Sequence, residues 1–297
     1  MQHPTFPWRS MLFVPITNPR FVTSAKKPNA ADALQLDLED SVASTEKQAA
    51  RDMVRGLSAE LQELGKAVLV RVNRPWRQLV RDLEACCWPS VQALTLPKTP
   101  DAGFIQAVAE VLDELEQERG MPAGHMRLIP MIEDAQALLN VESIAKAHPR
   151  VMGMIVGAED LAVSMQMQLS NDSLYLPNMI TLAACRAAGI APLGFIGSVA
   201  DFSDQEAFKQ TVQRAAGLGF AGAFCIHPSQ VAHANQAFSP SAAALERAQA
   251  LIKADEQARS EGLMTFRFEG RMVDAPVVAQ ARQLLERAQH WQQHSSL

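Results

Sequence analysis

Carboxylates and one arginine recur in this sequence at the ends of short apolar segments. Glu39 and Asp40 follow the second such segment, Glu133 the fifth and Asp160 the sixth, and Arg71 stands near the end of the third. Carboxylates that converge repel one another unless they are protonated or bridged by a cation. Ligand sets made only of oxygen favour Mg²⁺, Mn²⁺ or Ca²⁺ over zinc. The pattern therefore predicts a divalent cation site with an arginine beside it for an anionic substrate.

Each of these residues also has a structural explanation. A carboxylate directly after a strand is often the N-cap of the next helix, and an arginine is often one half of a surface ion pair. His227 stands before Pro228, where histidine more often holds a loop by hydrogen bonds than acts as a base. Lys98 ends the fourth apolar segment and is the one obvious amine for a Schiff-base aldolase, so that mechanism stays an alternative.

Other catalytic classes have less support in the residues. The sequence contains no Gly-x-Ser-x-Gly motif of an α/β-hydrolase and no His-Glu-x-x-His motif of a zinc enzyme. The four cysteines form no Cys-x-x-Cys pair. We expect them to be reduced and mostly buried, as in a protein of the cytosol.

The elements that must position these side chains alternate along the chain. Eight apolar, strand-like runs are separated by segments with apolar residues at helical spacing, for which Ser44 is the expected N-cap of the first long helix. The runs cover residues 11–15, 33–38, 67–72, 91–96, 127–132, 151–156, 190–196 and 222–226, and the clearest helices cover 45–64, 104–118, 135–147 and 204–218. Eight βα units over about 230 residues predict a parallel (β/α)8 TIM barrel, an α/β fold of about 250 residues. In that fold catalytic residues gather at the carboxyl ends of the strands.

The chain continues beyond the eighth run with a helical extension. We expect a barrel domain over residues 9–238 and a C-terminal extension or lid over 239–297. The extension is predicted to contain a helix at about 242–261, a turn at 270–274 and a final helix from about Pro276.

The bulk composition excludes several kinds of partner. A net charge of −5 and 6% aromatic residues give no basic stripe or stacking platform for a nucleic acid. No apolar run approaches the roughly 18 residues of a membrane span. The first residues lack the basic and apolar regions of a signal peptide. We therefore expect a cytoplasmic enzyme without membrane or nucleic-acid partners.

An ordered set of short strings resembles the citrate lyase beta-subunit-like group, with malyl-CoA and citramalyl-CoA lyases, of the HpcH/HpaI aldolase superfamily. Each string alone is weak, but together they run in the family's order from about residue 9 to 276. They are residues 9–15 (RSMLFVP), 37–42 (DLEDSV), 71–73 (RVN), 130–133 (PMIE), 157–161 (GAEDL), 226–230 (IHPSQ), 238–240 (FSP) and 270–276 (GRMVDAP).

The resemblance implies roles for individual residues. It implies that Glu133 and Asp160 bind Mg²⁺, that Glu39 and Asp40 lie near the metal and its waters, and that Arg71 contacts the substrate. It also implies a homotrimer or hexamer, in which Asp274 on the extension reaches the active site of a neighbouring subunit as the acid or base. Lys26 is a weaker candidate for substrate binding through the phosphates of coenzyme A.

The function implied is a Mg²⁺-dependent cleavage or formation of a carbon–carbon bond in a β-hydroxyacyl-CoA thioester. The products of cleavage are an acyl-CoA and a 2-oxo acid, as from malyl-CoA or citramalyl-CoA. The alternatives are an acyl-carrier-dependent citrate lyase beta-type subunit, a free-acid pyruvate aldolase and a malyl-CoA thioesterase.

Overall fold

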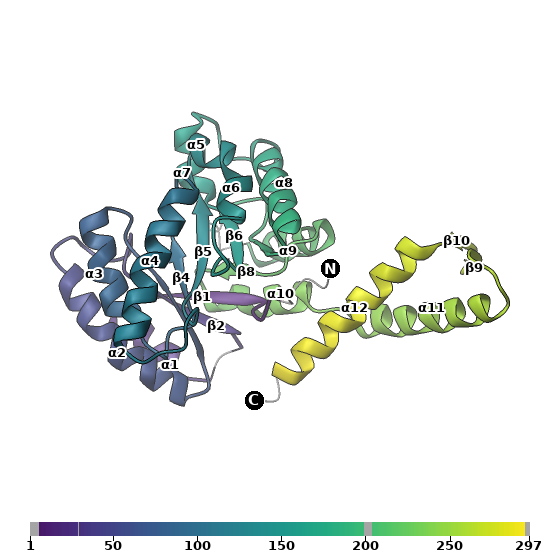
Figure 1. Cartoon of the computed structure of the whole chain (residues 1–297), viewed down its shortest axis with the longest axis horizontal. Coiled ribbons are helices and arrows are strands. Elements are labelled where there is room, and N and C mark those ends of the chain that lie inside the picture. Colours follow the sequence, from purple (N-terminus) through teal and green to yellow (C-terminus); the bar gives the residue numbers. More distant parts are fainter. Residues whose placement is uncertain (1–5, 29, 199–203, 295–297) are drawn as a thin grey trace. The chain divides into compact units, whose positions relative to one another are not determined.

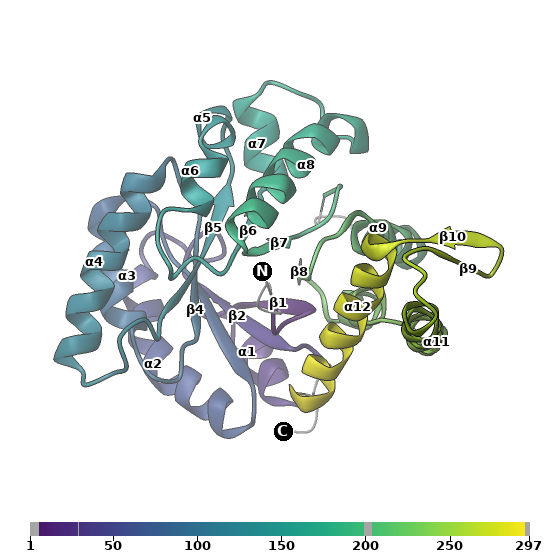
Figure 2. The same cartoon turned by 45° about the vertical axis from the view of Figure 1, so that its right-hand side comes forward.

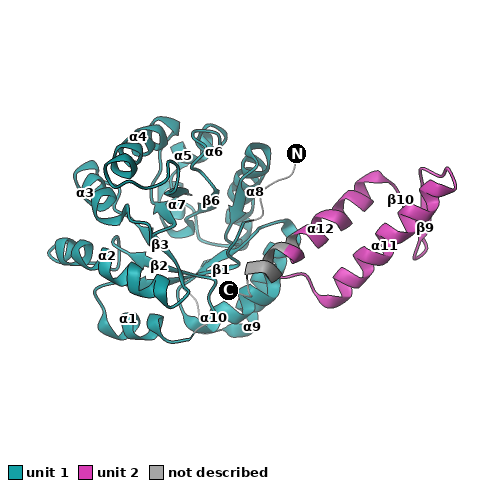
Figure 3. Cartoon of the chain, turned by 60° about the horizontal axis from the view of Figure 1, so that its bottom comes forward, with its two compact units in different colours: residues 1–238 teal, residues 239–297 magenta. Residues whose placement is uncertain are grey.

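The computed structural model describes residues 6–28, 30–198 and 204–294. The chain divides into two compact units, Met1–Phe238 and Ser239–Leu297, which are coloured separately in Figure 3. Each unit is described here by itself.

The first unit is a barrel of eight parallel strands, as the sequence predicts. The strands follow one another around the sheet in the order β7-β6-β5-β4-β3-β2-β1-β8. Backbone hydrogen bonds between the ends of β7 and β8 bring the two edges together, from Gly194 N to Gly222 O (2.8 Å) and from Ala221 N to Pro192 O (2.9 Å). Figure 2 shows the strands at the centre of this unit, with its helices outside them. The strands are β1 Ser10–Pro15, β2 Ala33–Asp37, β3 Ala67–Arg71, β4 Ala93–Leu96, β5 Arg127–Ile132, β6 Gly153–Val156, β7 Ala191–Leu193 and β8 Ala223–Cys225.

Helices follow each strand and cover the outside of the barrel (Figure 1). Their apolar faces pack with outward-pointing strand residues such as Leu34 and Leu36 in one large core. Burial of this apolar surface is the main favourable term in the stability of the fold. The helices are α1 Pro19–Lys26, α2 Lys47–Glu63, α3 Trp76–Cys86, α4 Ala102–Glu118, α5 Ala135–Leu139, α6 Val141–Ala145, α7 Ala158–Ser164, α8 Asn171–Ala188, α9 Gln205–Leu218 and α10 Pro228–Phe238.

Two local predictions are wrong. Ser44 does not cap α2, which begins at Lys47 after Glu46 and has no side-chain cap. The residues between Glu39 and Glu46 instead form a turn at the mouth of the barrel, because backbone N–H groups there bond to Asp37 and Glu39. The helix expected over 135–147 is two short helices, α5 and α6, which meet at Asn140.

A second core fills the barrel itself. Met11, Leu69, Ile129, Leu193 and Phe224 all lie in it, and all are nearly inaccessible to solvent. Because side chains alternate across a strand, residues two apart on β2 share the inner face. Ala33 therefore points into the barrel, followed by Gln35 and then Asp37 at the carboxyl end.

The second unit is built from two helices and a hairpin. Helices α11 Ala242–Ser260 and α12 Ala275–His294 pack together through Ala248, Leu251, Val278 and Ala281. The turn expected over 270–274 is wrong in part: Arg271–Val273 is strand β10, paired antiparallel with β9 Phe266–Phe268. Glu269 and Gly270 make the tight turn between them with φ of 48° and 77°, a combination typical of two-residue hairpin turns. In the described part of the chain, no helix is long and apolar enough to cross a membrane.

Candidate active site

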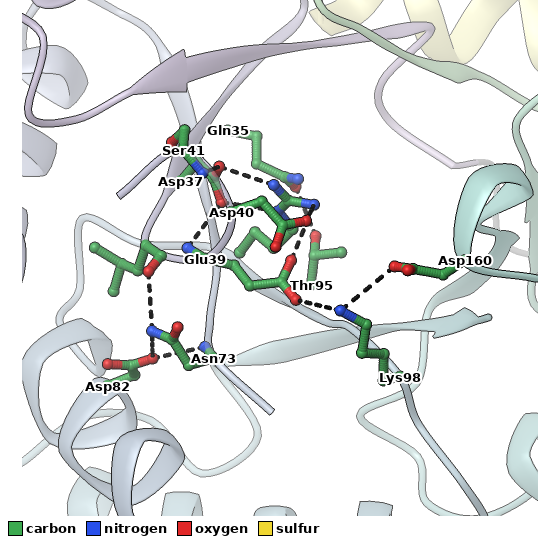
Figure 4. A network of polar contacts seen from close by, with 12 residues as sticks. Gln35, Asp37, Glu39, Asp40, Ser41, Asn73, Asp82, Thr95, Lys98 and Asp160 are labelled. Atoms are coloured by element: carbon green, nitrogen blue, oxygen red, sulfur yellow. Dashed lines mark hydrogen bonds and ion pairs between the residues drawn. The ribbon is translucent and has the colours of Figure 1, made fainter. Parts of the chain in front are cut away.

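The carboxyl ends of the barrel strands surround a cavity of about 520 Å³. Asp40, Arg71, Glu133 and Asp160 all line it, together with Asp37. The structure therefore brings together residues that are up to 123 positions apart in the sequence, by placing each at or just after the end of a strand. Figure 4 shows the acidic part of this cluster from close by.

Arg71, the last residue of β3, is held on one side by carboxylates. Its Nε and Nη2 donate to the two oxygens of Asp37 at 2.7 and 2.8 Å, and its Nη1 lies 3.0 Å from Glu39 and 3.6 Å from Asp40. Burial alone would lower the pKa of Arg71, but the hydrogen bonds and charge of Asp37, with the charges of Glu39 and Asp40, raise it above its ordinary value. A guanidinium carries five N–H donors. The hydrogen bonds to Asp37 use two of them, so three are left for Glu39, Asp40 and a ligand.

Glu133 is buried at the end of β5. Its Oε2 accepts a hydrogen bond from the backbone N–H of Lys98 at 2.5 Å. Gly157 passes directly over it: a β-carbon at this position would lie 2.4 Å from the Glu133 carboxylate. Desolvation by burial raises the pKa of Glu133 to about 7, although the Lys98 N–H lowers it, and the charges of Glu39 and Asp160 add to the rise.

The Lys98 ammonium lies between two of the carboxylates. Its Nζ is 3.3 Å from Glu39 and 3.4 Å from Asp160 (Figure 4). The burial of Lys98 lowers the pKa of its amine, but Glu39 and Asp160 raise it more. Lys98 is therefore protonated at neutral pH. A Schiff base needs a free amine, so this environment argues against the Schiff-base aldolase.

The same contacts test whether the site suits a divalent cation. No group of three or more His, Cys, Asp or Glu side chains arranged for a metal occurs among the residues that the structure describes. Mg²⁺, however, commonly takes one or two carboxylates and completes its octahedron with water and substrate oxygens. Here an ammonium already occupies a position between Glu39 and Asp160, and Glu133 has a raised pKa beside them. The carboxylates of Glu133 and Asp160 offer only oxygen atoms as ligands, which is the kind of donor set that Mg²⁺ prefers.

The raised pKa of Glu133 predicts a pH dependence of the metal-free protein. Between the ordinary value near 4.5 and about 7, the folded state keeps a proton that the unfolded chain has released. The free energy of unfolding should therefore fall as the pH rises through this window. Glu133→Gln, which can still accept from Lys98 N, should be more stable than the wild type at pH 8, by on the order of 2–3 kcal/mol, and similar to it at pH 4.5. Urea unfolding with EDTA at both pH values measures this. An equal effect of the substitution at both would contradict it.

Other predicted residues lie outside this cluster. Lys26 is on α1, where its Nζ lies 2.7 Å from Glu60 Oε2, and it does not line the cavity. His227 precedes α10, and its Nδ1 lies 2.8 Å from Ser229 Oγ. Asp274 belongs to the second unit, where it is exposed between β10 and α12 and its carbonyl accepts from Val278 N at 3.3 Å. All four cysteines are buried and unpaired by disulfides, as expected, and burial raises the pKa of each thiol.

Two residues of the site were not singled out from the sequence. Asp37 fixes Arg71 and also accepts from the backbone N–H groups of Glu39 and Ser41 at 3.0 and 3.1 Å. Burial would raise the pKa of Asp37, but the bonds from Arg71 hold it below its ordinary value. Gly157 leaves room for Glu133. The signal for Asp37 was present, since it is a charged residue near the end of the second apolar run and lies two residues before Glu39, and hence on the same face.

A family model described as HpcH/HpaI aldolase/citrate lyase matches residues 9–228. The chain belongs to this family. It is similar to L-malyl-CoA/beta-methylmalyl-CoA lyase of Rhodobacter capsulatus (33% identity, 95% of this chain and 94% of that one) and to the citrate lyase subunit beta of Leuconostoc mesenteroides subsp. cremoris (32% identity, 94% and 93%). The (3S)-malyl-CoA thioesterase of Cereibacter sphaeroides is 33% identical over 97% of both chains.

A solved structure of the same family resembles the whole chain. Protein CitE from Mycobacterium tuberculosis, in complex with magnesium, acetoacetate and coenzyme A, superposes with a TM-score of 0.73 at 30% identity and covers 97% of this chain and 100% of that one. The family and the barrel predicted from the sequence are therefore confirmed, and the protein is a lyase of the HpcH/HpaI family, similar to citrate lyase beta.

Proposed function

We propose that this lyase cleaves or forms a β-hydroxyacyl-CoA thioester, such as malyl-CoA or citramalyl-CoA, with Mg²⁺ as its cofactor. The observation that carries the proposal is the meeting of Glu133, Asp160 and Arg71 in one cavity at the carboxyl ends of the strands. A hydroxy acid offers a carboxylate and a hydroxyl, which match a cation on one side and a guanidinium on the other.

The cofactor would be held by Glu133 and Asp160, with Glu39 and Asp40 near its waters. Bound there, Mg²⁺ would act as a Lewis acid toward the oxygens of the hydroxy-acid end. The Mycobacterium tuberculosis relative was solved with magnesium and coenzyme A, which supports both the metal and the thioester.

Arg71 and Asp274 would stabilise negative charge and transfer a proton, respectively. During cleavage the proton of the substrate hydroxyl would pass to solvent, its oxygen would form the carbonyl of the 2-oxo acid, and the electrons of the broken carbon–carbon bond would pass to the α-carbon of the thioester. The N–H donors of Arg71 that are not bonded to Asp37 are available to negative charge in the cavity, and donors that are already oriented stabilise such charge most effectively. Asp274 would return a proton to the α-carbon, or remove it in the direction of synthesis. We place this residue at the site of a neighbouring subunit in a homo-oligomer.

Hydrolysis of the thioester is the second candidate. The chain is as similar to the Cereibacter sphaeroides thioesterase as to the malyl-CoA lyase, at 33% identity to each. A thioesterase would yield free coenzyme A and the hydroxy acid, so the two reactions differ in their products.

The metal is tested by removing it. Treatment with EDTA should abolish formation of a 2-oxo acid from malyl-CoA and citramalyl-CoA, and added Mg²⁺ should restore it. Asp160→Ala should be inactive yet fold normally, because the Asp160 side chain is 44% exposed and its contact to Lys98 is long, at 3.4 Å. Full turnover in metal-free buffer would contradict the proposal.

A further inference from the structure

The floor of the cavity holds a polar pair that the roles described above do not use. Gln35 on β2 and Thr95 on β4 both line the cavity, and both are 0% exposed. The Thr95 hydroxyl donates to Gln35 Oε1 at 2.6 Å. Figure 4 shows the two residues beside the acidic cluster. This bond fixes the orientation of the Gln35 amide: Oε1 faces Thr95, and Nε2 is the opposite end of the amide group.

Gln35 Nε2 is a buried donor without an acceptor among the described residues. Its surroundings are apolar: the strand partner of Gln35 is Phe13, whose ring lies 5.6 Å from that of Phe224, and both rings line the cavity with Ile155. A buried donor that makes no hydrogen bond is costly to keep, and an apolar side chain would fit this floor without that cost. The position thus has the character of a ligand contact rather than of core packing.

The depth of Gln35 indicates which part of a substrate it meets. It stands two residues before Asp37 on the same face of β2, one layer below the Asp37–Arg71 pair. If the proposed function holds, the carboxylate and hydroxyl of the substrate face Glu133, Asp160 and Arg71. The thioester must leave through the open mouth, because coenzyme A is too large for the barrel. The one remaining substituent of the hydroxyl-bearing carbon then points to the floor.

We propose that Gln35, oriented by Thr95, is a specificity-determining residue that donates a hydrogen bond from Nε2 to an oxygen on this substituent. The inference rests on the proposed function and names its substrate class. The preferred 2-oxo acid carries an oxygen on its side chain rather than a methyl group or hydrogen alone. A neutral hydroxyl suits a neutral amide, since a carboxylate buried this deep needs a charged partner.

The test compares two matched 2-oxo acids in the direction of synthesis. Wild-type enzyme with Mg²⁺ and acetyl-CoA is given pyruvate, with a methyl group, or hydroxypyruvate, with a hydroxymethyl group. We expect kcat/KM to be at least about 10-fold higher for hydroxypyruvate. Gln35→Leu should remove or invert this preference, mainly by a loss with hydroxypyruvate, while its melting temperature equals or exceeds that of the wild type. If Gln35→Leu fails to fold, Gln35→Met, which is unbranched and of similar length, serves the same purpose.

Variants of Thr95 test whether its hydroxyl orients the Gln35 amide or whether Thr95 only fills space in the floor of the cavity. Thr95→Val should weaken the preference, because the amide loses the donor that fixes it, and Thr95→Ser should retain it. Thr181→Val is the matched control: Thr181 is equally buried but bonds to Pro177 O within α8, so its loss should leave the ratio unchanged.

The possible results distinguish a failure of the Gln35 assignment from a failure of the proposed lyase function. A wild-type preference for pyruvate would overturn the inference, and so would an equal ratio of kcat/KM for hydroxypyruvate to kcat/KM for pyruvate in the wild type and in Gln35→Leu. In both cases the condensation reaction itself would still support the lyase function. No condensation with any 2-oxo acid by an enzyme that binds Mg²⁺ would overturn the proposed function instead, and this inference with it.

Discussion

Replacing Arg71 with lysine is expected to lower kcat by about 100- to 1,000-fold, the usual effect of losing one oriented donor to developing charge. Lysine keeps the positive charge but loses the planar fork that bonds Asp37 with Nε and Nη2 and that carries further N–H donors. The expected loss is in kcat more than in KM, because the interaction grows as negative charge develops. Steady-state kinetics with saturating Mg²⁺ measures it.

Arg9→Lys is the matched control for this substitution. Arg9 makes the same two-pronged contact, with Asp32, through Nε and Nη2 at 2.8 Å each. It precedes β1 and therefore stands at the amino end of the barrel. If both variants lose stability alike while Arg71→Lys keeps a near wild-type kcat, the role of Arg71 is structural.

Asp274→Asn is expected to lower kcat by about 10²- to 10⁴-fold, the contribution typical of a general acid or base. The residue is exposed and lies directly before α12, so asparagine, which caps a helix as well as aspartate does, should leave the melting temperature nearly unchanged. Asp101→Asn is the control, because Asp101 caps α4 by accepting from Phe104 N at 2.9 Å. That variant should keep full activity.

Subunit mixing tests whether Asp274 acts on a neighbour. An oligomer that contains both Asp274→Asn and Asp160→Ala chains would hold some sites in which both residues are intact. Mixing two inactive variants should therefore restore part of the activity. An absence of rescue, under conditions where the subunits are shown to exchange, would mean that Asp274 serves the site of its own chain or none.

The sequence predicted the strands and the residues at their ends because both follow from local patterns. Apolar runs mark buried strands, and the parallel barrel brings their carboxyl ends to one mouth. What the pattern does not contain is the contact between side chains. The pairing of Arg71 with Asp37, and the place of Lys98 between Glu39 and Asp160, depend on strand register and on rotamers.

Because side-chain contacts are not contained in local sequence patterns, Gln35 was not predicted as a site residue. It stands in the middle of the second apolar run, where Gln35 and Asp37 alternate with leucines and do not alter the prediction of a strand. Alternation places it on the same face as Asp37, but only the structure shows that it lines the cavity and bonds to Thr95. The hairpin of β9 and β10 was not predicted because strands of three residues are too short to show an alternation of apolar and polar residues.

In the proposed reaction, the bond broken in the thioester substrate lies between two carbon atoms and not between the acyl group and sulfur. The most direct measurement is the balance of products from malyl-CoA or citramalyl-CoA with purified protein and Mg²⁺. We expect one 2-oxo acid and one acyl-CoA for each substrate molecule consumed, with no free thiol. Release of free coenzyme A in step with substrate loss, without a 2-oxo acid, would contradict it.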